Sequence, residues 1–255
     1  MYDELASYYH LIFEDWDASI ARQAGVLGPL LETACGKPRL RILDAACGIG
    51  TQSIGLAMRG HAVTGSDLSE AAVARARVET AARKLAVPLY PADLRDLSGV
   101  PGGPFDAVVI ADNSLAHLLC EDDVRRAAAS AARKLDRGGI LLATMRDYDT
   151  LARERPASHG AAFYGDGGER RIVHQVWDWT GGRHYTMHLY ITRETAAGWD
   201  AHHFSSAFHA VPRAMVSGAL EEAGFTDVRW MEPGESGYYQ PVVLARLGEI
   251  TTARA

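Results

Sequence analysis

The sequence predicts an α/β fold with a doubly wound sheet of about seven strands, an antiparallel β insert and an N-terminal helical cover. From Leu40 onward, short β-rich runs alternate with helical stretches, the pattern of a parallel sheet flanked by helices. Residues 172–192 alternate in period two on both sides of Thr180-Gly181-Gly182-Arg183, which is typical of a β-hairpin. Residues 1–35 show the apolar spacing of helices.

Each predicted strand is a short apolar run that ends at polar or small residues. The run 105–111, Phe-Asp-Ala-Val-Val-Ile-Ala, is nearly continuous, as expected for a central strand buried on both faces. The strands predicted for the sheet are 41–44, 61–67, 87–90, 105–111, 140–145, 228–230 and 241–245. In the insert, residues 203–210 extend the hairpin as a further candidate strand.

Helix signals fill the intervals between these strands. Ser69 precedes an Ala/Arg/Glu-rich run that reaches about Leu85, and acids at 121–123 suit the positive end of a helix dipole. The predicted helices follow Gly50, span 69–85 and 121–135, and extend from Pro212 to Ala223. The chain therefore divides into a helical cover (1–39), a sheet domain (40–149 and 211–247) and an antiparallel insert on the substrate side (150–210).

Composition limits the class of protein. Of 255 residues, 47% are hydrophobic and 23% charged, which is typical of a globular domain rather than a disordered or disulfide-rich chain. The net charge of −6 provides no broad positive field, so we expect a small-molecule partner and neither nucleic acid nor membrane. Three scattered cysteines, no signal peptide and no long apolar run predict a cytoplasmic protein, either monomer or homo-oligomer.

The first strand runs into a turn of small residues, Asp44-Ala45-Ala46-Cys47-Gly48-Ile49-Gly50. Such a turn lets a ligand approach the backbone, and ligands of open α/β sheets bind at the carboxyl ends of the strands. Asp67, after the second strand, can accept both hydrogen bonds of a ribose diol. Ser53 stands where a dinucleotide fingerprint has its third glycine, so a nicotinamide-dependent oxidoreductase is the weaker alternative.

Polar residues also follow the third and fourth strands, at Asp93 and in Ala111-Asp112-Asn113-Ser114-Leu115-Ala116-His117-Leu118. With four motifs in this order, the sequence resembles the class I S-adenosylmethionine-dependent methyltransferases, strongly over 41–145 and more loosely elsewhere. The resemblance implies a Rossmann-like fold and S-adenosylmethionine as cofactor, with S-adenosylhomocysteine as product. It implies that the turn holds the methionine end, Asp67 the ribose and Asp93 the adenine amino group. The cofactor-binding residues so predicted are Arg22, Asp44, Ala46, Gly48, Gly50, Asp67, Leu68, Asp93, Leu94, Ala111 and Asn113.

A narrower resemblance is to the glycine and glycine/sarcosine N-methyltransferases. Residues 113–117 are similar to their Asn-Ser-Phe-Ala-His segment, and Arg146-Asp147-Tyr148-Asp149 is similar to their Arg-Asn-Tyr-Asp segment. This implies an N-methyltransferase for an amine or amino-acid-like acceptor. Asp147 replaces an asparagine near the substrate of those enzymes and would repel an amino-acid carboxylate. The alternative is a natural-product enzyme that methylates a planar nitrogen heterocycle or a hydroxyl.

The chemistry requires little more than alignment, because the sulfonium already activates its methyl group and positioning can supply roughly 7–11 kcal/mol of the barrier. An amine acceptor must still lose its proton, for which Asp147 and His117 are the candidate catalytic residues and His188 a weaker one. Arg146 is a candidate anion clamp. The predicted substrate-binding residues are Tyr8, Tyr9, Arg146, Asp147, Trp177, Tyr190 and Tyr239, and the aromatic ones among them have a competing interpretation as core. Histidines 202, 203 and 209 lack metal-ligand spacing, so we expect no metal.

Overall fold

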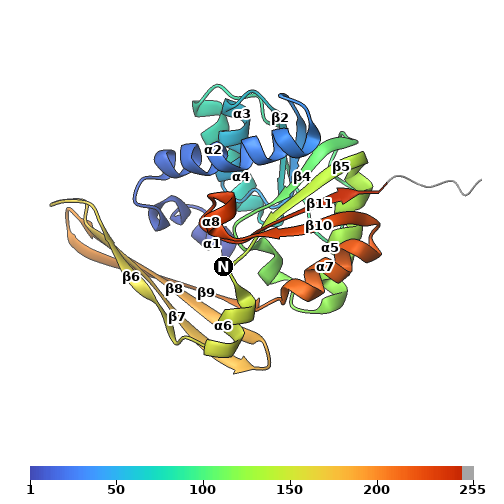
Figure 1. The fold of residues 1–255 in the computed structure, drawn as a ribbon. Helices are drawn as coiled ribbons and strands as arrows, with labels where there is room; N and C mark the ends of the chain where they lie inside the picture. The colour runs from blue at the N-terminus through green and yellow to red at the C-terminus, as the bar shows by residue number, and fades with distance from the viewer. Residues whose placement is uncertain (249–255) are drawn as a thin grey trace, which may run out of the picture.

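The computed structural model describes residues 1–248 and contains a seven-stranded sheet beside a separate four-stranded antiparallel sheet (Figure 1). The predicted fold class is confirmed. The order of the large sheet is β10-β11-β5-β4-β1-β2-β3. Its strands are β1 (Arg41–Asp44), β2 (Ala62–Asp67), β3 (Leu89–Pro91), β4 (Phe105–Ile110), β5 (Leu135–Thr144), β10 (Phe225–Met231) and β11 (Val242–Leu247).

The pairing of these strands creates one switch point. β1 pairs in parallel with both β2 and β4, whereas β11 runs antiparallel to β5. The chain thus leaves β1 in one direction through β2 and β3 and returns on the other side through β4 and β5. All six residues of β4 are buried, as expected for a central strand. Crevices at such a switch point are where open α/β sheets bind ligands.

Helices cover both faces of the large sheet. Leu27 and Leu31 of α2 pack with Ile42 of β1 on one face, while Val124 of α5 packs on the opposite face in the cluster that contains Leu43. The helices are α2 (Trp16–Cys35), α3 (Thr51–Met58), α4 (Glu70–Ala82), α5 (Glu121–Lys134) and α7 (Arg213–Glu222). None of the helices within residues 1–248 has the length and apolar character needed to cross a membrane.

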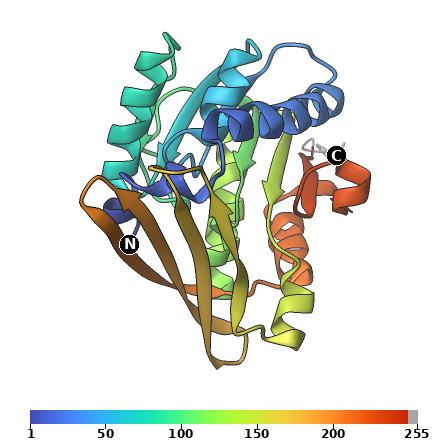
Figure 2. The same cartoon turned by 90° about the vertical axis from the view of Figure 1, so that its left-hand side faces the viewer.

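The insert is a sheet of four antiparallel strands in sequence order: β6 (Ser158–Tyr164), β7 (Arg171–Gly181), β8 (His184–Thr195) and β9 (Gly198–His209). The hairpin between β7 and β8 turns where the sequence predicts. β6 was not predicted, because this edge strand contains Gly160 and two alanines rather than β-branched residues. In Figures 1 and 2 the insert projects from one end of the large sheet, to which α6 (Tyr148–Glu154) connects it.

The N-terminal segment lies between the large sheet and the insert. It contains α1 (Tyr2–Leu5) and the 3₁₀ turn η1 (Tyr9–Ile12). Asp3 accepts a hydrogen bond of 2.6 Å from Ser69 Oγ at the start of α4, and Arg171 of β7 donates to the carbonyl oxygens of Leu11 and Phe13. The cover is therefore held from both sides.

Candidate cofactor and acceptor site

A cavity of about 310 Å³ lies at the carboxyl ends of the central strands, beneath the N-terminal cover. This volume is within the range of small-molecule sites. Tyr2, Ala6 and Tyr9 of the cover line it on one side, and η2 (Ser114–His117) contributes Ser114 and His117 on another. Seven of the eleven predicted cofactor residues line this cavity: Ala46, Gly48, Asp67, Leu68, Asp93, Leu94 and Ala111.

The turn after β1 presents its backbone to this cavity. Gly48 has φ +53°, and a Cβ built there meets no atom within 4 Å, so open space adjoins the backbone. A side chain at this position would occupy that space in a strained conformation. The Gly48 N–H donates to Asp67 Oδ2 at 2.8 Å, which fixes the turn against the end of β2.

Asp67 is placed to accept hydrogen bonds from a ligand. Its Oδ1 accepts from the Ser69 N–H at 2.9 Å, and its Oδ2 accepts from Gly48. Each carboxylate oxygen keeps a second lone pair, so both can accept from a diol. Burial raises the pKa of Asp67 above its usual value. The neighbouring Leu68 is 68% exposed and lines the same cavity, which offers an apolar surface to a flat base.

The charge of the cavity lining favours a cation. Three carboxylates line it, those of Asp67, Asp93 and Asp112, against one guanidinium, that of Arg95. Arg95 donates to both oxygens of Asp93 and holds the pKa of that carboxyl below its usual value. The remaining excess of negative charge attracts a sulfonium and disfavours the anionic diphosphate of a dinucleotide.

The other four predicted cofactor residues lie outside the cavity lining. Asp44 is fully buried behind the turn, where its Oδ2 accepts from Ser53 Oγ at 2.6 Å. Burial raises the pKa of Asp44 to about 7. Gly50 begins α3 in the left-handed region, and exposed Arg22 donates to Ser19 Oγ. Asn113 Oδ1 accepts from the Arg146 N–H at 2.7 Å and ties the ends of β4 and β5 together.

His117 lines the cavity and has a defined partner. Tyr2 Oη lies 2.6 Å from His117 Nε2, so the cover and the sheet domain share a hydrogen bond there. Burial lowers the pKa of His117 to about 4, while a hydrogen bond to the backbone of Ala207 acts in the opposite direction. The imidazole is consequently neutral near pH 7, in the form that accepts a hydrogen bond from a hydroxyl.

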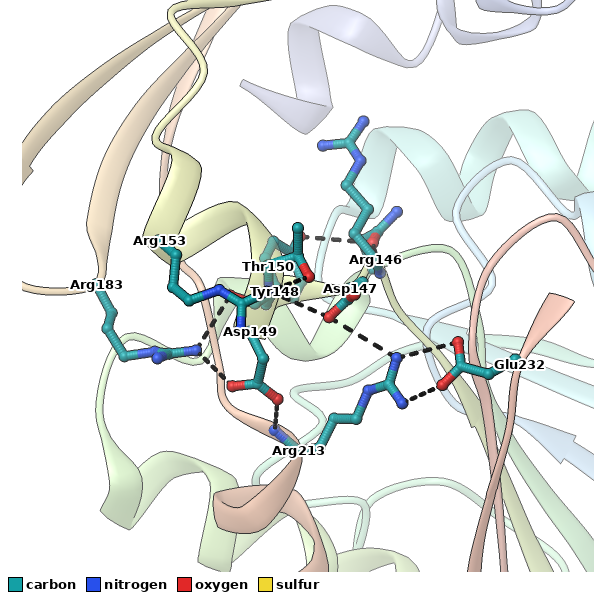
Figure 3. A network of polar contacts seen from close by, with 10 residues as sticks. Arg146, Asp147, Tyr148, Asp149, Thr150, Arg153, Arg183, Arg213 and Glu232 are labelled. Carbon is teal, nitrogen blue, oxygen red and sulfur yellow. Dashed lines mark hydrogen bonds and ion pairs between the residues drawn. The ribbon is translucent and has the colours of Figure 1, made fainter.

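Asp147, predicted as a catalytic and substrate-binding residue, lies outside the cavity lining. Figure 3 shows its carboxylate directed toward Arg213, 3.7 Å away, and Arg213 also pairs with Glu232. Its Oδ1 accepts from the Thr150 N–H at 3.2 Å and caps the start of α6. The structure thus gives Asp147 the role of a helix cap, which aspartate fills well because it satisfies an unpaired N–H of the first turn.

Arg146 extends in the opposite direction from Asp147 (Figure 3). Its guanidinium carbon lies 4.9 Å from the ring centre of Trp177, and its Nη2 donates to Gln175 Oε1 at 3.2 Å. In the part of the chain that the structure describes, the hydrogen-bonding partner of this guanidinium is an amide rather than a carboxylate. Arg146 lies outside the cavity lining, and it keeps an uncompensated positive charge where the sheet domain meets the insert.

The predicted aromatic acceptor pocket is not assembled at the cavity. Trp177 is buried in the insert core against Tyr185, with ring centres 5.0 Å apart. Tyr190 stacks on His174 and His203 on the other face of the insert, because it lies one residue out of step with buried Leu189 and Ile191. His188 shares that outer face, where it contacts His203 and Asp178.

The remaining predicted aromatic contacts divide between the cover and the loop before β11. Tyr9 lines the cavity, whereas Tyr8 lies over His202 of the insert with ring centres 4.1 Å apart. Tyr239 is 54% exposed and donates a hydrogen bond to Asp112.

Several residues that line the cavity were not predicted from the sequence, and two of them have polar side chains that contact the predicted ones or follow the same strand ends. Asp112, adjacent to the predicted pair Ala111 and Asn113, lines the cavity, as does Tyr2. Asp112 could have been found from its place at the end of a buried strand, by the same rule that identified Asp67 and Asp93. No local signal identifies Tyr2, whose partner His117 is 115 positions away.

Comparison with known proteins identifies the central part of the chain. Residues 42–139 match the model of a methyltransferase domain family. The chain is 35% identical over 158 residues to a protein of Bacillus subtilis (strain 168) named as the methyltransferase YqeM, covering 62% of this chain and 58% of that one. It is 34% identical over 137 residues to the glycine/sarcosine N-methyltransferase of Parasynechococcus marenigrum (strain WH8102), covering 54% and 48%.

The chain thus spans roughly half the length of each of these relatives. Among solved structures, the sugar N-methyltransferase KedS8 from Streptoalloteichus sp ATCC 53650 superposes with a TM-score of 0.74 at 21% identity, over 90% of this chain and 88% of that one. The fold of this chain is therefore that of a methyltransferase, and the resemblance seen in the sequence is confirmed.

Proposed function

We propose that this chain, with its methyltransferase domain at residues 42–139, transfers a methyl group from S-adenosylmethionine to the nitrogen of a small amine or amino-acid-like acceptor. The observation that carries this proposal is the cavity at the switch point, with an open glycine turn and three carboxylates against one guanidinium. The cavity fits the cofactor: Gly48 would adjoin its methionine end, Asp67 its ribose, and Leu68 and Asp93 its adenine. When bound, the cofactor supplies a methyl group already activated by the sulfonium.

The residues of the chain would then act chiefly by positioning. Tyr2 and Tyr9 of the cover close the cavity, which excludes water and holds the two reactants at a fixed distance. Neutral His117 accepts from Tyr2 and is too weakly basic to hold a proton near pH 7. Arg146 provides the cation that would bind a carboxylate of the acceptor.

Nitrogen as the acceptor atom is supported by two lines. The names of the Parasynechococcus marenigrum relative and of KedS8 both specify N-methylation. The acid expected to repel an amino-acid carboxylate, Asp147, pairs with Arg213 instead. The alternative acceptor, a planar heterocycle or a hydroxyl, loses support because Trp177 and Tyr190 do not line the cavity that contains the predicted cofactor residues.

Calorimetric titration tests the cofactor assignment. We expect S-adenosylhomocysteine to bind with micromolar affinity, because the cavity offers a diol acceptor and an apolar surface, and NADH to bind at least tenfold more weakly, because its diphosphate meets uncompensated carboxylates. Methyl release should then be measured against a panel of amino acids, amines, amino sugars and nitrogen heterocycles. Tight NADH binding without S-adenosylhomocysteine binding would refute the proposal.

Replacing Arg146 with methionine tests the acceptor class. The substitution keeps an apolar stem against Trp177 and removes the charge. For an acceptor from the panel that carries a carboxylate, we expect KM to rise at least tenfold, because a charge-assisted hydrogen bond is worth roughly 1.5–3 kcal/mol. The KM of amines without a carboxylate and the affinity for S-adenosylhomocysteine should change by less than about twofold. Equal losses for both acceptor types would remove Arg146 as an anion clamp.

A further inference from the structure

Asp112, directly after β4, presents a carboxylate whose hydrogen-bonding partners within residues 1–248 are all neutral. Its Oδ1 accepts from Tyr238 Oη at 2.8 Å and from Tyr239 Oη, and its Oδ2 accepts from Gln52 Nε2 at 2.7 Å. These three donors come from α3 and from the loop before β11, and they fix the carboxylate in place. They do not neutralise it, because none of them carries a positive charge at physiological pH.

The carboxylate of Asp112 has at least one hydrogen-bond acceptor position that these donors do not fill. Tyr238 has one hydroxyl proton but lies within hydrogen-bond distance of both Gln23 Oε1, at 2.6 Å, and Asp112 Oδ1. It can donate fully to one of them only. A carboxylate has about four acceptor positions, so at least one on Asp112 remains for a donor from outside this network.

The tyrosines remain donors because their protons are held. Burial, with the charge of Asp112 as the next cause, raises the pKa of Tyr238 far above the usual value, and the hydroxyl of exposed Tyr239 keeps its proton near pH 7 as a tyrosine ordinarily does. Neither hydroxyl therefore becomes a second anion beside Asp112. Gln23, 1% exposed, supports the network from α2 and also accepts from Gln52 Nε2 at 2.6 Å.

The backbone at Asp112 is held in an unusual conformation. Asp112 and Asn113 have φ values of +57° and +69°, in the left-handed region that residues other than glycine occupy infrequently. The Asp112 N–H donates to Thr144 Oγ1 at 2.9 Å, which anchors this turn to the end of β5. Such outliers persist where the surroundings fix them, and they concentrate at functional sites.

Asp112 lines the same cavity as the acids expected to bind the cofactor, but it follows a strand on the opposite side of β1. The acids expected to meet ribose and adenine follow β2 and β3, on one side of β1. Asp112 follows β4, on the other side of β1, and lines the cavity. Arg146 follows β5 outside the cavity lining, where its guanidinium lies over Trp177 of the insert. The two halves of the rim therefore carry different charge patterns: the second pairs one uncompensated anion with one uncompensated cation.

We propose that Asp112 binds the acceptor's nitrogen as a cationic alkylammonium and takes one proton from it before the neutral amine attacks the methyl group, with Arg146 available for a carboxylate on the same molecule. This inference rests on the proposed function and narrows it, since it selects basic aliphatic amines over hydroxyls and over heterocycles that are uncharged near pH 7. The ammonium donates to the free acceptor position of Asp112 and replaces the missing cation beside it.

The test is the substitution Asp112→Asn, probed with ethylammonium chloride titrated into the complex with S-adenosylhomocysteine. Asparagine adopts the left-handed region readily and keeps one acceptor oxygen, so we expect the fold to be retained. Wild type should bind ethylammonium in the millimolar range, and the variant at least tenfold more weakly. S-adenosylhomocysteine lacks the sulfonium charge that the cavity carboxylates attract, so its affinity for the variant should stay within about twofold of wild type.

Two matched variants complete the experiment. Asp147→Asn removes a carboxylate from the same rim outside the cavity and should bind ethylammonium like wild type. Tyr239→Phe removes a neutral donor but keeps the charge, so it should bind at least as tightly as wild type. The inference would be overturned if wild type and Asp112→Asn bound ethylammonium equally, or if wild type did not bind it. It would also be overturned if Asp112→Asn lost affinity for S-adenosylhomocysteine. Wild type that fails to bind S-adenosylhomocysteine would instead refute the proposed function.

Discussion

Replacing Asp67 with alanine is expected to weaken S-adenosylhomocysteine binding by at least tenfold. The cofactor diol would lose one or two charge-assisted hydrogen bonds, worth roughly 1.5–3 kcal/mol each. The same change leaves the N–H groups of Gly48 and Ser69 without their acceptor, so the turn itself should loosen. Calorimetric titration measures the first effect, and urea denaturation of the free protein measures the second as a loss of about 1–3 kcal/mol.

The conservative variant Asp67→Asn separates the two roles. Its remaining carbonyl oxygen can accept from Gly48 or Ser69, so stability should recover in part while the affinity for the diol stays low. Asp147→Asn serves as the control acid, because Asp147 lies outside the cavity. If Asp67→Ala bound S-adenosylhomocysteine as tightly as wild type, Asp67 would not be a ribose ligand.

The sequence predicted well the residues whose position depends only on where a strand ends. The ends of β1, β2, β3 and β4 follow from local apolar runs, and parallel strands bring their carboxyl ends to one rim. Asp67, Asp93 and the glycine turn could therefore be placed on a common cavity without coordinates. This inference needs only the direction of each strand and no knowledge of side-chain packing.

The direction of a side chain in a loop or on an inserted sheet was harder to predict. Asp147 and Arg146 are adjacent, yet Asp147 caps α6 and Arg146 faces the insert, a difference set by a helix that the sequence interpretation missed. The period-two pattern of β8 did separate two faces. It could not show that the face with Tyr185 belongs to the hydrophobic core shared with the sheet domain, which leaves Tyr190 on the outside.

The second large effect concerns Asp44, for which we expect a pH-dependent gain in stability on replacement by asparagine. Burial raises the pKa of Asp44 from 3.8 in the unfolded chain to about 7 in the folded protein. Between these values the unfolded chain releases the proton and the folded protein retains it. The unfolding free energy therefore falls as pH rises through this window, by an amount on the order of 4 kcal/mol at about 1.36 kcal/mol per pKa unit.

His117 acts in the opposite sense over nearly the same range. Its pKa falls from 6.5 to about 4 on folding, so the unfolded chain binds a proton that the folded protein rejects. The unfolding free energy contributed by this residue therefore falls as pH decreases from 6.5 to 4, by an amount on the order of 3 kcal/mol. In wild type the two contributions to the unfolding free energy largely offset each other. The unfolding free energy of wild type should therefore change little with pH as a result of these two residues.

Single substitutions should separate them. Urea denaturation of wild type, Asp44→Asn and His117→Gln between about pH 4.5 and 7.5 gives the difference in unfolding free energy at each pH, which cancels the groups common to all three proteins. The difference for Asp44→Asn relative to wild type should become more favourable as pH rises, and that for His117→Gln as pH falls. Asparagine still accepts from Ser53 Oγ, so its other effects on stability should not vary with pH. If the differences in unfolding free energy stayed constant across the pH range, burial would not shift the pKa of Asp44 or of His117. The Asp44 carboxylate would then be charged in the folded protein without lowering its stability.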